Sequence, residues 1–117
     1  MRTMLKSKIH RASVTDANID YEGSITLDKR LMKAADILPY ERVSILDVNN
    51  GARLETYAIE GPSGKGDVII NGAAARLVHK GDKIIIMTFS PMEESQAIAH
   101  HPRLVYVTDK NAVARTK

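Results

Sequence analysis

The segment Tyr21-Glu22-Gly23-Ser24-Ile25-Thr26 holds the most distinctive potential chemistry in this chain. A serine hydroxyl that attacks the carbonyl carbon of the residue before it breaks the backbone at that bond, here between Gly23 and Ser24. The glycine leaves the attacked carbonyl uncrowded and tolerates a strained backbone. The serine can then become a pyruvoyl group, an electrophilic ketone made from the protein itself. The segment therefore predicts a self-cleavage site, although a Gly-Ser pair also occurs in ordinary turns.

A second candidate is the segment Arg53–Ile59, an expected strand in which alternate side chains share a face. Arg53, Glu55 and Tyr57 lie on one face of it. An arginine can hold a carboxylate through two parallel hydrogen bonds, and a nearby tyrosine can donate a proton. These residues could bind and protonate an acidic substrate, but the exposed polar face of a barrel strand has the same composition.

Lys8 and His10 share a face of another expected strand, Thr3–His10. They too could belong to a functional site or could lie on the exposed polar face of a barrel strand. A metal site is not expected, because cysteine is absent and the histidines lack a ligand spacing. These histidines are His10, His79, His100 and His101. The glycine-rich run from 61 to 66 contains Gly-Lys, but it lacks the spacing of a phosphate-binding loop and is expected to be an exposed loop.

Short alternating segments separated by turn residues predict the elements that must position these side chains. The expected strands are Thr3–His10, Ser24–Leu27, Arg42–Val48, Arg53–Ile59, Val68–Ile70, Lys83–Phe89 and Leu104–Val107. The expected helices are Lys29–Ala35 with Asp28 as its cap, Ala73–Val78, and Pro91–Ala99 with Pro91 in its first turn. Asn49-Asn50-Gly51 predicts a hairpin, and the polar tail from Lys110 is expected to be mobile. Many short strands favour an all-β fold, a barrel or a sandwich.

The composition is that of one domain of 117 residues, with 44% hydrophobic residues and a formal charge of +3. No apolar run is long enough to span a membrane, and the first residues lack the apolar core of a signal peptide. The absence of cysteine fits a reducing compartment, and we expect a cytoplasmic protein. The basic charge is compatible with RNA, but one Phe and no Trp provide few stacking surfaces, so nucleic-acid binding is not expected.

Five short motifs, in this order along the chain, resemble the aspartate 1-decarboxylases, a family of pyruvoyl-dependent enzymes that make β-alanine for pantothenate. The motifs are Met1-Arg2-Thr3-Met4-Leu5 with Lys8-Ile9-His10-Arg11, Tyr21-Glu22-Gly23-Ser24, Asn50-Gly51 with Arg53, Thr56-Tyr57-Ala58-Ile59, and Asn71-Gly72-Ala73-Ala74-Ala75. The resemblance covers nearly the whole chain and is weakest in the tail.

The resemblance implies a double-psi β-barrel with a few short helices, assembled as a homotetramer with active sites between neighbouring subunits. It also implies that a single domain is made as a proenzyme and cuts itself into residues 1–23 and 24–117, in some members with a helper protein. The cofactor is then a covalent pyruvoyl group derived from Ser24, and the reaction converts L-aspartate to β-alanine and carbon dioxide.

The resemblance also assigns roles to individual residues. Ser24 becomes the pyruvoyl group and forms the Schiff base with the substrate, and Tyr57 is the proton donor. Thr56 polarises the carbonyl of Gly23 during cleavage, supported by His10, Tyr21 and Asn71. The substrate is bound by Arg53, Lys8, Asn71, Gly72, Ala73 and Ala74. The sequence does not tell which of Arg53 and Lys8 binds which carboxylate of the substrate. It also leaves two alternatives to an enzyme: a non-catalytic barrel that binds a small anion or a partner, and a small basic RNA-binding barrel.

Overall fold

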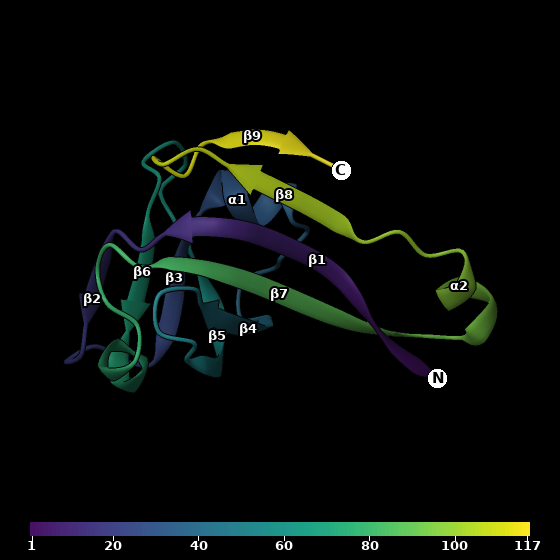
Figure 1. Ribbon diagram of the computed structural model, residues 1–117, viewed down its shortest axis with the longest axis horizontal. Coiled ribbons are helices and arrows are strands. Elements are labelled where there is room, and N and C mark those ends of the chain that lie inside the picture. Colours follow the sequence, from purple (N-terminus) through teal and green to yellow (C-terminus); the bar gives the residue numbers. More distant parts are fainter.

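A computed structural model describes all residues from 1 to 117, and its nine strands form one mixed sheet (Figure 1). The strands are β1 (Arg2–Ser13), β2 (Asp16–Asn18), β3 (Ser24–Asp28), β4 (Arg42–Asp47), β5 (Arg53–Gly61), β6 (Val68–Asn71), β7 (Lys83–Met92), β8 (Arg103–Val107) and β9 (Val113–Thr116). The helices are α1 (Lys29–Ala34), the 3-10 helix η1 (Gly72–Arg76) and α2 (Glu94–Ile98). No helix has the length and apolar character needed to cross a membrane.

The strand order is β2-β6-β3-β5-β4-β7-β1-β8-β9, with parallel pairs β1–β8, β2–β6 and β3–β5 among the antiparallel ones. The predicted all-β fold is confirmed, and this mixed topology is consistent with a double-psi β-barrel. Each of the seven predicted strands is present. Figure 1 shows β1 and β7 as a long ribbon pair that extends away from the other strands toward α2.

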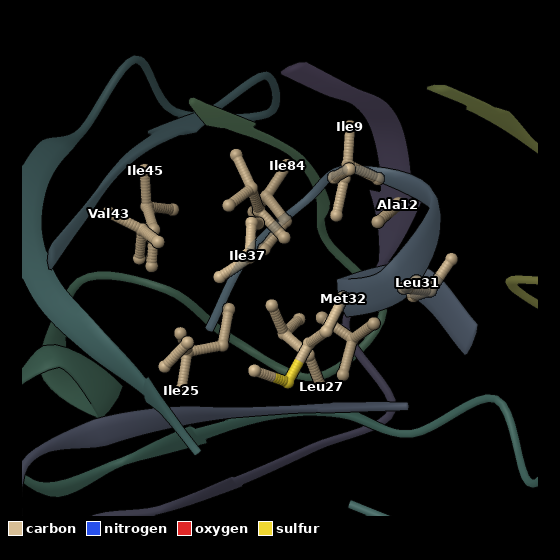
Figure 2. Packing of buried hydrophobic residues seen from close by; sticks show 14 of the residues in the cluster. Ile9, Ala12, Ile25, Leu27, Leu31, Met32, Ile37, Val43, Ile45 and Ile84 are labelled. Atoms are coloured by element: carbon tan, nitrogen blue, oxygen red, sulfur yellow. The ribbon is translucent and has the colours of Figure 1, made fainter. Parts of the chain in front are cut away.

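The core is a cluster of 18 buried residues, mostly isoleucine, valine and leucine from the strands. Figure 2 shows side chains of several strands and of α1 converging on it, among them Ile25, Leu27, Met32 and Ile84. Strand β4 alternates as predicted, since Val43 and Ile45 are buried while their neighbours are not. Each fully buried isoleucine contributes about 2 kcal/mol by leaving water.

Helix α1 confirms the prediction made from Asp28, whose side chain accepts a hydrogen bond from the backbone N–H of Arg30 at 2.8 Å. Leu31, Met32 and Ala35 are buried, as their spacing indicates. The cap and the apolar face together attach the helix to the core at the end of β3, the strand that begins with Ser24.

The predicted helix from Pro91 is wrong at its start, because Pro91 lies in β7 and α2 begins at Glu94. Strand β4 pairs with β7 only as far as Met87, so beyond that residue β7 has a free edge. Pro91 is paired with Thr3 of β1 on one side. On its other side no strand is present to accept a hydrogen bond, so the backbone N–H that proline lacks is not needed there.

Three further elements differ from expectation. The residues predicted as the helix Ala73–Val78 form the shorter 3-10 helix η1. Strand β2 was not predicted, and the tail contributes strand β9, which pairs with β8. All four residues of β9 are exposed. Because neither face of the strand is buried, its sequence does not need to alternate between apolar and polar side chains.

Candidate active site

Ser24 and Asn71 face each other across the antiparallel pair β3–β6. Side chains of such directly opposed residues lie on the same face of the sheet, within contact distance. The Asn71 Nδ2 group donates a hydrogen bond to Ser24 Oγ at 3.1 Å and another to Thr26 Oγ1 at 3.0 Å. Both Ser24 and Asn71 are almost fully buried, with 2% and 4% of their surfaces exposed. The candidate nucleophile is therefore held by a fixed, desolvated amide.

The Ser24 hydroxyl donates its own hydrogen bond to the carbonyl oxygen of Glu22 at 3.3 Å. No histidine or carboxylate is hydrogen-bonded to Ser24 Oγ, so within one chain no side chain acts as its general base. The serine is oriented beside the bond before it, but it is not activated in the manner of a hydrolase triad.

A hollow of about 300 Å³ opens beside Gly23, the residue that precedes Ser24. Its size suits a small molecule. The residues that line it are Gly23, Leu54, Glu55, Thr56, Asn71, Ala73, Ala74 and Leu77. The hollow thus brings together five residues singled out from the sequence. No hydrogen bond joins Thr56 to Gly23.

Leu54 and Leu77 form an apolar wall of this hollow that was not predicted from the sequence. Leu54 could have been found, because it shares a face of β5 with Thr56. Leu77 follows η1 and carries no comparable signal. These residues make one side of the hollow apolar, while Glu55 and Asn71 supply polar atoms.

Gly72 lies so close to the backbone of Gly23 that a side chain on Gly72 would collide with it. Gly72 has a φ of +78°, and a β-carbon built on it would lie 2.6 Å from the Cα and 2.8 Å from the N of Gly23. Gly23 itself has no such restriction, because a β-carbon on it would meet nothing within 4 Å. This concerns only contacts with the rest of the fold, so the expectation that glycine keeps the carbonyl uncrowded for attack by its neighbour Ser24 stays a prediction.

Arg53 and Tyr57 lie on β5 but do not line the hollow. Arg53 is exposed and forms no ion pair, so its charge is free to bind an anion. The ring of Tyr57 lies 6.3 Å from that of Tyr40, between ring centres. Tyr21 is exposed and does not line the hollow.

No hydrogen bond joins Lys8 or His10 to Ser24, and in the strand order β5, β4 and β7 lie between β1 and β3. The His10 ring packs edge-on against Tyr106, and its buried Nδ1 atom has no hydrogen-bond partner. Burial lowers the pKa of His10, and the positive charges of Lys8 and Arg11 lower it further. The imidazole is thus neutral near pH 7.

The chain matches the family model described as aspartate decarboxylase over residues 1–114. It is 60% identical over 114 residues to an aspartate 1-decarboxylase of Dehalococcoides mccartyi, covering 97% of this chain and 92% of that protein. It is 57% identical over 116 residues to the enzyme of the same name from Syntrophotalea carbinolica, covering 99% and 88%. For the one from Thermoanaerobacter pseudethanolicus the identity is 56% over 110 residues, covering 94% of each chain. These matches show that the chain, with its buried serine next to a small hollow, belongs to the aspartate decarboxylase family.

Proposed function

We propose that this protein is a pyruvoyl-dependent aspartate 1-decarboxylase, which converts L-aspartate to β-alanine and carbon dioxide for pantothenate synthesis. The observation that carries the proposal is the buried Ser24, hydrogen-bonded by Asn71 and placed next to Gly23 at a small hollow. The relatives that match nearly the whole chain bear the same enzyme name.

In this proposal the protein first cuts itself between Gly23 and Ser24. Ser24 Oγ attacks the Gly23 carbonyl carbon, its proton passes to the Ser24 nitrogen, and the amide becomes an ester. Loss of the Ser24 α-proton then expels the Gly23 carboxylate and leaves dehydroalanine. Addition of water releases ammonia and leaves a pyruvoyl group at residue 24. The oxygen that becomes charged in the first step needs a donor, and Thr56 is the candidate in the same hollow.

The pyruvoyl group, once formed, supplies a ketone that condenses with the substrate amine and withdraws electrons from the bond to the departing carboxylate. The surroundings of residue 24 fit such a group. Ser24 and Asn71 are almost fully buried, which limits the access of water to residue 24, and the adjoining wall of Ala73 and Ala74 leaves room for a small substrate. The Asn71 amide can remain a donor to an oxygen at residue 24.

Three side chains of this protein would handle the substrate. Arg53, a cation without an ion pair, binds one carboxylate, and Lys8 provides a second positive charge. Tyr57 returns a proton after carbon dioxide leaves. A substrate with only one carboxylate would leave a cation unpaired, which explains selection of a dicarboxylic amino acid.

Neither Lys8 nor His10 is hydrogen-bonded to Ser24, and their strand β1 is not a neighbour of β3 in the strand order, which supports a site that is shared between subunits. A buried, unpartnered atom such as His10 Nδ1 is costly, and a neighbouring chain can provide its partner. We therefore propose a homotetramer in which Lys8 and His10 of one subunit complete the site of the next. A helper protein for cleavage and a cytoplasmic location stay predictions.

The test is the intact mass of the purified protein under denaturing conditions, together with β-alanine formation from L-aspartate. We expect two fragments, residues 1–23 and 24–117, the larger one blocked to Edman degradation. The Ser24→Ala variant should remain one chain and form no β-alanine. A wild-type chain that stays intact on prolonged warming and forms no β-alanine would instead support a non-catalytic barrel.

A further inference from the structure

We propose that Gly72 is a positioning residue for self-cleavage, acting before any substrate binds. Its missing side chain lets the turn that carries Gly23 lie directly against the end of β6. The inference rests on the proposed function, because it concerns the bond that the protein is proposed to cut. It assigns to Gly72 a role separate from contact with substrate.

The contact between Gly72 and the turn is made of backbone atoms only. A β-carbon on Gly72 would lie 2.6 Å from Gly23 Cα, 2.8 Å from Gly23 N and 3.0 Å from the Tyr21 carbonyl oxygen. No flexible side chain can move aside to relieve such contacts, so the turn itself would have to shift. Packing against the rest of the fold thus requires glycine at position 72, whereas a β-carbon on Gly23 would meet no atom within 4 Å other than those of its chain neighbours.

Asn71 and Gly72 together hold both partners of the first step. Asn71 fixes the attacking oxygen through its hydrogen bond to Ser24 Oγ. Gly72, the next residue, contacts the backbone of Gly23 and so sets the distance between Gly23, with its carbonyl, and the end of β6. Because β3 is paired to β6 from Ser24 onward, displacement of the turn would move Gly23 while the serine stays in place.

The step affected is the acyl shift, in which the Ser24 oxygen bonds to the Gly23 carbonyl carbon and the bond to nitrogen breaks. Attack requires the two atoms to be held near contact, and a misplacement of about 1 Å can slow a reaction about 100-fold. We expect Gly72→Ala to cut itself 10-fold to about 100-fold more slowly than the wild type.

Two other glycines provide matched controls. Gly51 has nearly the same φ, +76°, but a β-carbon there meets nothing within 4 Å, so Gly51→Ala reproduces the backbone strain alone. Gly66 also has a φ of +76°, and its β-carbon would lie 2.5 Å from the Lys110 carbonyl oxygen, outside the hollow. Gly66→Ala therefore reproduces strain and crowding elsewhere in the fold.

The experiment follows fragment formation by mass spectrometry in freshly purified proenzymes, normalised to the folded fraction from circular dichroism. Hydroxylamine, which cleaves esters faster than amides, is added to a parallel sample to detect the ester. We expect Gly51→Ala and Gly66→Ala to cleave within about threefold of the wild type, and Gly72→Ala to be slow without a hydroxylamine gain. Cleavage of Gly72→Ala at the rate of Gly51→Ala overturns the inference and leaves the proposed function intact.

A semisynthetic Gly72→D-Ala chain keeps the test decisive if Gly72→Ala does not fold. D-alanine prefers positive φ and directs its methyl group away from the position that a normal β-carbon would occupy. It should cleave at close to the wild-type rate, and slow cleavage in a folded D-alanine chain would overturn the inference. A wild-type chain that never cleaves overturns the proposed function and this inference together.

Discussion

The side-chain amide of Asn71 donates a hydrogen bond to the hydroxyl of Ser24 at 3.1 Å, from directly across the β3–β6 pair. The two residues are 47 positions apart in the sequence. The same amide also donates to Thr26 Oγ1, so one buried side chain links the first and third residues of β3. Asn71 therefore orients the serine and completes the buried polar contacts of the strand.

Asn71→Ala should slow self-cleavage about 10-fold or more, because Ser24 Oγ loses the contact that fixes its position. It should also lower the free energy of unfolding by about 1 to 2 kcal/mol, since the buried hydroxyl of Ser24 and the half-buried hydroxyl of Thr26 lose a donor. The matched control is Thr26→Val, which removes only the second hydrogen bond. Fragment formation and urea unfolding measure the two effects; equal cleavage rates in both variants would show that Asn71 does not orient Ser24.

Asp28 should make the stability of the protein depend on acidic pH. Burial raises the pKa of this carboxyl, but hydrogen bonds from the Arg30 side chain and from the backbone of Gly66, Arg30 and Gly64 outweigh that effect and lower the pKa to about 2. A lowered pKa contributes stability above the unfolded value of 3.8 that is lost as pH falls through about 2. The contribution is about 2 kcal/mol.

Asp28→Asn should therefore be less stable than the wild type at pH 6, and the difference should shrink by about 2 kcal/mol at pH 2. Urea unfolding at a series of pH values measures it. A difference that stays constant across the series would mean that Asp28 stabilises the helix cap through its shape and not through its charge.

The strands were predictable because burial on one face imposes alternation on the sequence, as in Val43 and Ile45 of β4. Alternation fails where neither face is buried, which is why β9 escaped prediction. Pro91 was placed in a helix because its tolerance in β7 depends on where β4 stops pairing, a property of the folded sheet. Local preference could not reveal that free edge.

The site was less predictable than the fold. Gly23-Ser24 stands out in the sequence, but the contact of Ser24 with Asn71 depends on the register of two distant strands. Gly72 gave no sign of its close approach to Gly23, since a glycine after a strand usually indicates only a turn. Lys8 and His10 were candidates because they share a face of β1, but only the resemblance assigned their roles, and neither is hydrogen-bonded to the serine.

Tyr57→Phe should cut itself normally but decarboxylate L-aspartate about 100-fold more slowly, because only the proton-donating hydroxyl is removed. Tyr40→Phe is the matched control, since its ring is the exposed neighbour of Tyr57 at 6.3 Å and undergoes the same change. Steady-state kinetics with intact-mass analysis separate the two activities. Normal turnover in Tyr57→Phe would remove this residue as the proton donor.

A site shared between subunits predicts complementation between two inactive variants. Lys8→Met and Ser24→Ala should each be inactive alone, because one lacks a substrate-binding cation and the other lacks the cofactor precursor. In tetramers reassembled from equal amounts, about one quarter of the sites would combine an intact Ser24 with a neighbour's intact Lys8, and β-alanine formation should return to about that level.

The control pair for this experiment is Ser24→Ala with Asn71→Ala. These two residues are hydrogen-bonded within one chain, so every site with an intact Ser24 would carry the Asn71 substitution. Mixing them should give no activity beyond that of Asn71→Ala alone. If the Lys8→Met and Ser24→Ala mixture also shows no gain after verified subunit exchange, Lys8 must serve the serine of its own chain, and the proposal of a shared site is wrong.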